Sequence, residues 1–253
     1  MTASDQYILE VIARRSVTPV HLGDARLYSI LSIIRNWAGS ALNDIKLSGS
    51  SAKNLVVQGQ PDTDIFISIK SSSDATLKTI YESLNSTLRS NGIIASKRTV
   101  ALNINYNGLD IDLVPGKVQP GYKIWHSLYN SESDSWLQTN IDEHIKIVKN
   151  SGRDQEIRAI KIWAKQNQLK FPSLYLESLV IDALYNRSKE NLATNIFIVF
   201  KFLNENVELR RVVDPANTNN VLSSYMLTSR EKQNIAKAAG KAYNENYWNN
   251  IIN

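Results

Sequence analysis

Gly49-Ser50, then eleven residues, then Asp62-Thr63-Asp64 and the apolar run Ile65-Phe66-Ile67 form the stretch of the sequence that decides the fold. Successive side chains of a strand alternate between its faces, so Asp62 and Asp64 point the same way and Thr63 points away. Carboxylate oxygens suit hard cations such as Mg²⁺, which keep open positions for substrate phosphates. A Gly-Ser turn brings backbone N–H groups and a hydroxyl close to anionic oxygens. The stretch therefore predicts a phosphate-binding turn followed by a metal-binding strand, although each half is by itself a common pattern.

A second acidic strand is expected over residues 109–115, which read Leu109-Asp110-Ile111-Asp112-Leu113-Val114-Pro115. Its alternation places Asp110 and Asp112 on one face. If this strand lies beside the strand that bears Asp62 and Asp64, acidic side chains of both strands converge on one spot. The alternative is an edge strand with a solvated acidic face, ended by Pro115.

Together these motifs resemble the three-part signature of the polymerase-β-like nucleotidyltransferases: Gly49-Ser50, Asp62-Thr63-Asp64 and Asp112-Leu113-Val114-Pro115. The later sequence is similar to the branch that holds the 2′-5′-oligoadenylate synthetases, the bacterial cGAS/DncV-like enzymes (CD-NTases) and the archaeal CCA-adding enzymes. The segments that carry this likeness are Trp136-Leu137-Gln138-Thr139-Asn140, His144-Ile145, Ala159-Ile160-Lys161-Ile162-Trp163 and Pro172-Ser173-Leu174-Tyr175-Leu176-Glu177. The combination is specific to the superfamily and much less specific to any one product.

The resemblance implies a site that uses two Mg²⁺ ions, or Mn²⁺, held by Asp62, Asp64 and Asp112. Asp112 is the candidate general base because the Leu-Val-Pro that follows it matches the family's order, and Asp110 is its rival on the same face. The residues implied for nucleotide binding are Gly49, Ser50, Lys161, Ser173 and Tyr175. One departure weakens the phosphate-loop match, since Asn54-Leu55 stands where relatives commonly have Gly and Thr.

Two of the nucleotide-binding predictions have plain structural alternatives. Lys161 lies at the border between the apolar and basic faces of a helix expected over 153–168, so it either points into a cleft, as the resemblance implies, or belongs to a solvated basic face. Ser173 follows Pro172 at the start of the next helix, where unpaired N–H groups favour an anion, but a Ser at this place is as readily a capping residue.

The position of Tyr175 departs from the family pattern for base stacking. Many relatives have an aromatic residue directly after the Ser, whereas this chain has Leu174 and then Tyr175. One residue on a helix rotates a side chain by about 100°, which takes it out of a pocket. Glu177 lies on a mostly apolar helix and is interpreted as a structural ion-pair partner.

The expected fold class is α+β: a polymerase-β-like core of mixed or antiparallel sheet with flanking helices, then a helical domain, with the active site in the cleft between them. Residues 1–138 are assigned to the catalytic domain, including N-terminal helices, and residues 139–253 to an all-helical nucleotide-binding domain. Strands are expected near 43–48, 62–69, 94–99, 101–106 and 109–114. The turn Tyr106-Asn107-Gly108 is expected to join two antiparallel strands, and Val213 to Ser224 reads as a surface loop.

Composition narrows the chemistry. The 253 residues include 43% apolar and 21% charged residues and no cysteine, which excludes disulfides, thiolate zinc sites and a cysteine nucleophile. Residues 1–144 carry a net charge of −1 and residues 145–253 a net charge of +6, which suits a metal-binding half and a phosphate-facing half, or else Lys-rich solvated helices. The N-terminus shows no targeting pattern and no apolar run reaches membrane-spanning length, so we expect a cytoplasmic protein.

The expected function is transfer of NMP from an NTP or dNTP to a nucleotide hydroxyl with release of pyrophosphate, without a template. The favoured product is a short linear or cyclic oligonucleotide that serves as a signal in bacterial antiphage defence, with an effector or regulatory protein as partner. The alternatives are an enzyme that extends RNA or DNA 3′ ends, as CCA-adding enzymes do, or one that modifies a protein. A hypothesis of another class is an inactive module that binds nucleotides or nucleic acid.

Overall fold

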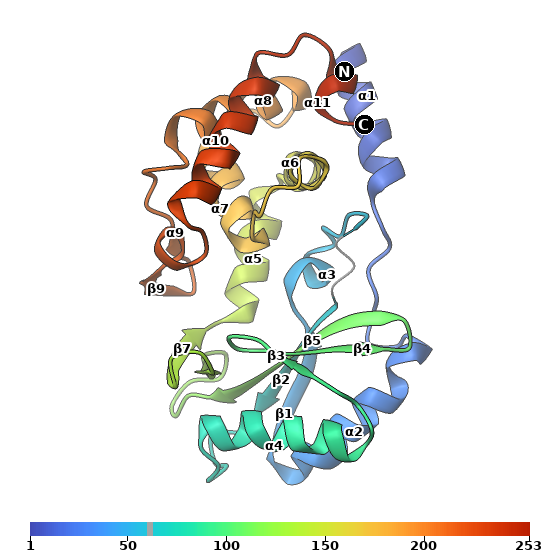
Figure 1. Cartoon of the computed structure of the whole chain (residues 1–253), viewed down its shortest axis with the longest axis vertical. Coiled ribbons are helices and arrows are strands. Elements are labelled where there is room, and N and C mark those ends of the chain that lie inside the picture. The colour runs from blue at the N-terminus through green and yellow to red at the C-terminus, as the bar shows by residue number, and fades with distance from the viewer. Residues whose placement is uncertain (60–62) are drawn as a thin grey trace. The chain divides into compact units, whose positions relative to one another are not determined.

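The computed structural model describes residues 1–59 and 63–253, and the chain divides into two compact units. One, which we call the sheet unit, comprises Pro19–Asn54 and Pro61–Glu143. The other, which we call the helical unit, comprises Met1–Thr18, Leu55–Gln60 and His144–Asn253. Most helices and strands of the two units are labelled in Figure 1.

The sheet unit is built on one mixed sheet. Its strands follow the order β1-β2-β5-β4-β3, and β6 pairs with β5 while β7 pairs with β6. The neighbours β2 and β5 are parallel, and the other pairs are antiparallel. The strands are β1 (Leu42–Leu47), β2 (Thr63–Ile69), β3 (Ser96–Lys97), β4 (Leu102–Tyr106), β5 (Leu109–Val118), β6 (His126–Asn130) and β7 (Ser135–Thr139).

One face of this sheet carries the apolar core. Along β5 the side chains alternate, with Ile111 and Leu113 fully buried and Asp112 half-buried between them, as a strand with one core face requires. The helices α2 (Tyr28–Ala38) and α4 (Leu77–Ser90) pack on the core face through apolar residues at helical spacing. Figure 1 shows both helices along the same side of the sheet. The short elements η1 (Ala25–Leu27), η2 (Gly39–Ala41) and α3 (Gly49–Lys53) complete the unit.

A two-residue turn joins β4 to β5, as the sequence predicts. Asn107 and Gly108 have positive φ angles of 49° and 75°, the conformation that a tight turn with the twist of its strands needs. Tyr106 and Leu109 are the first paired residues on either side of it. The turn therefore fixes the register of the whole hairpin.

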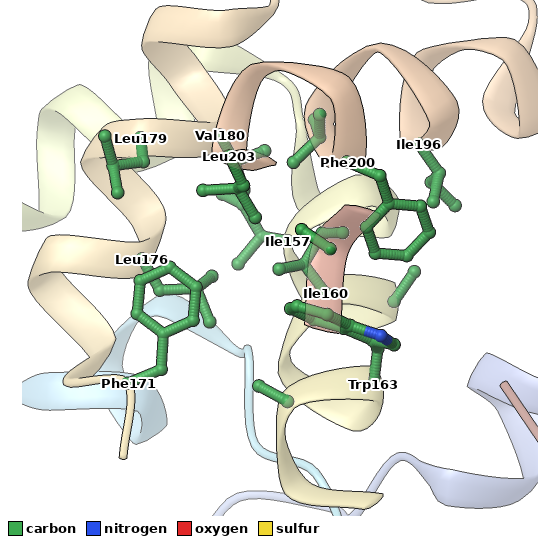
Figure 2. Packing of buried hydrophobic residues seen from close by; sticks show 14 of the residues in the cluster. Ile157, Ile160, Trp163, Phe171, Leu176, Leu179, Val180, Ile196, Phe200 and Leu203 are labelled. Atoms are coloured by element: carbon green, nitrogen blue, oxygen red, sulfur yellow. The ribbon is translucent and has the colours of Figure 1, made fainter. Parts of the chain in front are cut away.

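The helical unit has its own core, in which α6 (Asp154–Gln166) is the central helix. Ile157, Ile160 and Trp163 are nearly completely buried, and the rings of Trp163 and Phe200 lie 5.0 Å apart. Figure 2 shows these side chains turned toward residues of α7 (Ser173–Ala183) and α8 (Leu192–Asn206). The remaining elements are α1 (Ala3–Arg15), the part of α5 (Ile141–Ser151) that begins at His144, β8 (Val213–Asp214), β9 (Asn217–Val221), α9 (Leu222–Tyr225), α10 (Ser229–Tyr243) and α11 (Trp248–Ile251).

The N-terminal helix departs from the domain division expected from the sequence. That division places residues 1–138 together, whereas α1 packs in the helical unit, with Ile8 and Val11 buried in its core. The Asp5 carboxylate caps the start of α1 and also accepts a hydrogen bond from the Ala193 N–H at the start of α8, at 2.9 Å. An amphipathic helix shows its apolar face in the sequence, but not the partner that covers that face.

Candidate active site

Two of the predicted aspartates are neighbours across β2 and β5. In the parallel register Asp64 pairs with Asp112, and adjacent strands lie about 4.8 Å apart. Both carboxylates are half-buried, while Ile65 and Leu113, the residues that follow them, are fully buried on the core face. Asp64 and Asp112 therefore stand side by side on the face away from the core, which is the convergence predicted from the two acidic strands.

Gly49 lies directly against the Asp64 carboxylate. It has a φ of +57°, and a Cβ atom built on it would lie 1.7 Å from Asp64 Oδ2. The backbone N–H of Ser48 donates to the Asp64 carbonyl at 2.9 Å, which fastens this turn to β2. The Gly49-Ser50 pair begins the short helix α3, so the glycine permits an approach of backbone to carboxylate that no other residue would allow.

Asn103 on β4 is a site residue that the sequence reasoning missed. Its side-chain amide donates to Asp112 Oδ1 at 2.9 Å and to Asp110 Oδ1 at 2.5 Å. Asn103 is the registered partner of Asp112 across β4 and β5. A two-residue turn at Asn107-Gly108 pairs Tyr106 with Leu109 and therefore Asn103 with Asp112. The sequence thus contained the information that places Asn103 beside Asp112.

The same face of β2 is closed by packing further along the strand. Phe66 meets the His126 ring edge-on at 4.8 Å, and Ser68 Oγ lies 2.7 Å from His126 Nε2. Burial lowers the pKa of His126, which favours the neutral ring in a structural role. On this face of β2, His126 covers Phe66 and Ser68, whereas Asp64 remains partly exposed to solvent.

The described residues fit part of the predicted metal site. Asp64 and Asp112 supply carboxylate oxygens, the ligands that Mg²⁺ and Mn²⁺ prefer, and the Asp64 carboxylate occupies the space that a side chain at Gly49 would fill. The third predicted ligand, Asp62, lies outside the described residues. Among the residues that are described, no three His, Asp or Glu side chains form a group arranged to hold a metal ion.

Comparisons with known proteins give one curated relative with a partial match. No protein-family model matches the sequence. An alignment of 160 residues is 27% identical to cyclic AMP-AMP-AMP synthase of Escherichia coli (strain MS 115-1), and it covers 57% of this chain and 49% of that protein. The chain thus spans about half the length of the curated relative it matches.

Solved structures match nearly the whole chain. E. coli MS115-1 CdnC with ATP matches with a TM-score of 0.70 and 20% identity over 94% of this chain and 89% of that one, and the same protein complexed with HORMA-deltaN also gives 0.70. Bradyrhizobium diazoefficiens CdnG with GTP gives a TM-score of 0.78 and 12% identity over 96% of this chain and 91% of that one. This chain has the polymerase-β-like fold of the CD-NTases. The α+β fold class predicted from the sequence is confirmed.

Within the helical unit of this CD-NTase fold, Lys161 is almost completely buried. Its Nζ lies 3.0 Å from Glu177 Oε1, and the two side chains are 1% and 0% exposed. The interpretation of Glu177 as an ion-pair partner is therefore confirmed. Contact between Lys161 and a triphosphate stays a prediction. In this structure the ammonium group that would bind the phosphate is paired with the Glu177 carboxylate.

Ser173 and Tyr175 lie in the first turn of α7. Pro172 occupies the N-cap position, so Ser173, which is half-buried, is the first helical residue and not the cap. Tyr175 is 0% exposed, and its hydroxyl donates to the Val207 carbonyl at 3.4 Å. Burial raises the pKa of Tyr175 to about 12. This placement favours a structural role for Tyr175 and argues against base stacking by its ring.

Nowhere along residues 1–59 and 63–253 does a helix combine the length and apolar character needed to cross a membrane.

Proposed function

We propose that this chain is a metal-dependent, template-independent nucleotidyltransferase. It transfers NMP from an NTP to a hydroxyl group of another nucleotide and releases pyrophosphate. The observation that carries the proposal is the register of Asp64 and Asp112 on neighbouring parallel strands, with Gly49 directly against the Asp64 carboxylate. The CD-NTase fold supports it.

The carboxylates that would hold Mg²⁺ or Mn²⁺ are Asp64 and Asp112, with Asp62 as the third ligand. When bound, such cations neutralise the charge of the phosphates and lower the pKa of a coordinated hydroxyl. Gly49 and Ser50 offer backbone N–H groups and a hydroxyl for phosphate oxygens beside these carboxylates. The aspartates thus supply ligands for the cations, and the Gly49-Ser50 turn supplies hydrogen-bond donors for the phosphate.

The reaction is a displacement at the α-phosphorus of the NTP. The acceptor oxygen forms a bond to phosphorus while the bond from that phosphorus to the bridging β-oxygen breaks, and the electron pair leaves with pyrophosphate. The hydroxyl proton passes to a carboxylate, which we assign to Asp112. Asp112 suits this role better than Asp110, because Asp112 is the registered neighbour of Asp64.

Two residues of the helical unit remain proposed triphosphate contacts. Ser173, half-buried at the first position of α7, has a hydroxyl that can donate to a phosphate oxygen. Lys161 would have to exchange its buried partner Glu177 for a phosphate, so its role requires a rearrangement within the unit. Tyr175 is not included, because it lies in the core.

The product we favour is a short cyclic or linear oligonucleotide that acts as a signal in bacterial antiphage defence. The partial match to a cyclic AMP-AMP-AMP synthase supports a cyclic product. The complex of E. coli CdnC with HORMA-deltaN supports a regulatory protein as partner. The net charge of +6 on residues 145–253 is also compatible with a nucleic-acid acceptor, so the test includes one.

The test is an assay of purified protein with labelled NTPs and dNTPs, singly and mixed, with Mg²⁺ or Mn²⁺, and with or without an oligonucleotide. We expect an oligonucleotide product that forms from NTPs alone and requires the divalent cation. Asp64→Asn and Asp112→Asn should each lower its rate at least about 100-fold. The matched control is Asp74→Asn, a change of an exposed aspartate outside the strands of the same unit, which should leave the rate unchanged.

Other outcomes choose among the alternatives. Product that forms only on an added oligonucleotide would replace this proposal with 3′-end extension, and label on the protein itself would indicate protein modification. Nucleotide binding without any product would favour the inactive module. Full activity of Asp64→Asn would contradict the metal-site assignment.

A further inference from the structure

Asn103 is placed to act on two carboxylates at once. It lies on β4 directly opposite Asp112, and Asp110 is the diagonal neighbour on the same face of β5. Its Nδ2 donates to Asp112 Oδ1 at 2.9 Å and to Asp110 Oδ1 at 2.5 Å. Cross-strand and diagonal neighbours are the pairs whose side chains meet in an antiparallel hairpin.

The orientation of the amide follows from the chemistry of its partners. An ionised carboxylate only accepts hydrogen bonds, and the Asn NH₂ group carries two hydrogens that point in different directions. A reversed amide would place its carbonyl oxygen against two carboxylate oxygens and would gain no hydrogen bond. Asn103 therefore presents one hydrogen to each aspartate and separates two like charges that share a face.

We propose that Asn103 is a positioning residue for the nucleotidyl transfer, an inference that rests on the proposed function. By its hydrogen bond Asn103 holds the Asp112 carboxylate in one orientation beside Asp64. By its second hydrogen bond it engages Asp110, so that Asp110 does not take the place of Asp112. The register places Asp112, and not Asp110, beside Asp64, and the amide holds both carboxylates in that arrangement.

The hairpin does not depend on this bridge for its folding. Backbone pairing joins β4 and β5 over five residue pairs, and Leu102 and Ile104 of β4 are buried in the core on the opposite face. Loss of the Asn103 donors should therefore disturb the carboxylates more than the fold. This separates a positioning role from a structural one.

The test compares Asn103→Leu, which keeps the size but removes both donors, with Asn105→Leu. Asn105 is the matched control because it lies on the same strand and the same face, opposite Asp110, and is exposed. We expect Asn103→Leu to lower kcat by about 10- to 100-fold and to weaken Mn²⁺ binding by a similar factor, as loss of a residue that orients a ligand does. KM for the NTP should change little, and Asn105→Leu should behave as wild type.

Two further variants check the direction of the effect. Asn103→Asp places a third acceptor against two carboxylates and should impair the rate at least as much as Asn103→Leu. Asn103→Gln retains the NH₂ group and should recover part of the rate. Thermal unfolding identifies any variant that fails to fold, and Mn²⁺ binding is measured by electron paramagnetic resonance without nucleotide.

The outcomes separate this inference from the proposed function. If Asn103→Leu keeps wild-type kcat and Mn²⁺ affinity, or if Asn105→Leu is impaired equally, the positioning role is rejected. If the wild type binds Mn²⁺ but makes no product, the proposed function fails while the Mn²⁺ comparison still decides on Asn103. If the wild type neither binds Mn²⁺ nor forms product, both are rejected.

Discussion

Gly49 leaves no space for a side chain beside the Asp64 carboxylate. In Gly49→Ala the new methyl group would overlap Asp64 Oδ2, which lies 1.7 Å from the Cβ position, and would displace the carboxylate. A misplacement of about 1 Å in a catalytic site costs about 100-fold in rate, so we expect a loss of this size in kcat, measured as pyrophosphate release.

The control for this prediction is Gly92→Ala. Gly92 also has a positive φ, of +75°, but its Cβ position meets no atom within 4 Å. Both variants should lose about 1–2 kcal/mol of stability from the left-handed backbone, measured by urea unfolding. Only Gly49→Ala should lose activity, and equal activity of the two variants would contradict the role of Gly49.

Asp110 and Asp112 should differ in their importance although they share a face. We expect Asp112→Asn to lower kcat by about 10²- to 10⁴-fold, the range for loss of a general base, and Asp110→Asn by less than about tenfold. Single-turnover assays at saturating NTP measure both. A larger loss in Asp110→Asn would reverse the assignment.

At the residue scale, the sequence was sufficient to predict the position of a side chain where a short-range rule, such as strand alternation or a tight turn, applies. Strand alternation predicted that Asp110 and Asp112 share one face, and the pairing of β2 with β5 then puts Asp112 beside Asp64. The tight turn at Asn107-Gly108 contained the register that places Asn103. Tyr175 is different, because its hydroxyl donates to the Val207 carbonyl, 32 residues further along the chain, and only the tertiary packing brings that carbonyl to it.

At the scale of elements, the contact between α6 and α7 includes the buried pair Lys161 and Glu177. Lys161→Met should cost about 3–5 kcal/mol, because it leaves the Glu177 carboxylate buried without its cation, whereas Lys161→Met/Glu177→Leu should recover most of that loss. Urea unfolding measures both. A single variant as stable as the double one would contradict the importance of this pair.

The same double variant tests the proposed triphosphate contact. Loss of one charge-assisted hydrogen bond to phosphate, worth about 1.5 kcal/mol, corresponds to about a tenfold rise in KM for ATP. Since the double variant keeps the core packed, this rise would be independent of stability. An unchanged KM would assign Lys161 a structural role alone.

The link between α1 and α8 predicts a dependence of stability on pH. The Asp5 carboxylate accepts from the Ala193 and Thr2 N–H groups at 2.9 and 2.8 Å, and these hydrogen bonds lower its pKa. The ionised Asp5 side chain therefore stabilises the folded protein at pH values above its unfolded-state pKa of about 3.9. This stabilisation is lost as the pH falls toward the lower pKa of the folded state.

Asp5→Asn should therefore be less stable than the wild type at pH 7, and the difference should vanish in acid. Urea unfolding from pH 7 to pH 2.5 measures it. The control is Asp74→Asn, whose exposed side chain should give no such trend. A difference that stays constant with pH would contradict the role of the Asp5 charge.

Some elements were not predictable from local pattern. The strands β6 and β7 were not expected, because His126–Asn130 and Ser135–Thr139 become strands by pairing with β5 and with each other. Val213 to Ser224 was interpreted as a loop, yet it contains the β8–β9 hairpin and the beginning of α9. Its Asn-rich sequence lacks the apolar alternation that indicates a strand.

At the scale of the whole chain, the order of a strand-rich part followed by a helical part was evident from the sequence. The sequence did not show that Met1–Thr18 belongs with His144–Asn253. That contact joins residues far apart in the chain, such as Asp5 and Ala193, and no local rule specifies it. The fold likewise does not specify the acceptor, since function depends on the site and not on the architecture.

The most direct test of the central claim is the number of pyrophosphates released for each NTP consumed, together with the mass of the product. A cyclic oligonucleotide releases one pyrophosphate for every nucleotide incorporated, and a linear one releases one fewer and keeps its 5′-triphosphate. We predict pyrophosphate release in one of these ratios by the wild type and release at least about 100-fold slower by Asp112→Asn. Release of orthophosphate alone, or NTP consumption that is unchanged in Asp112→Asn, would contradict the claim.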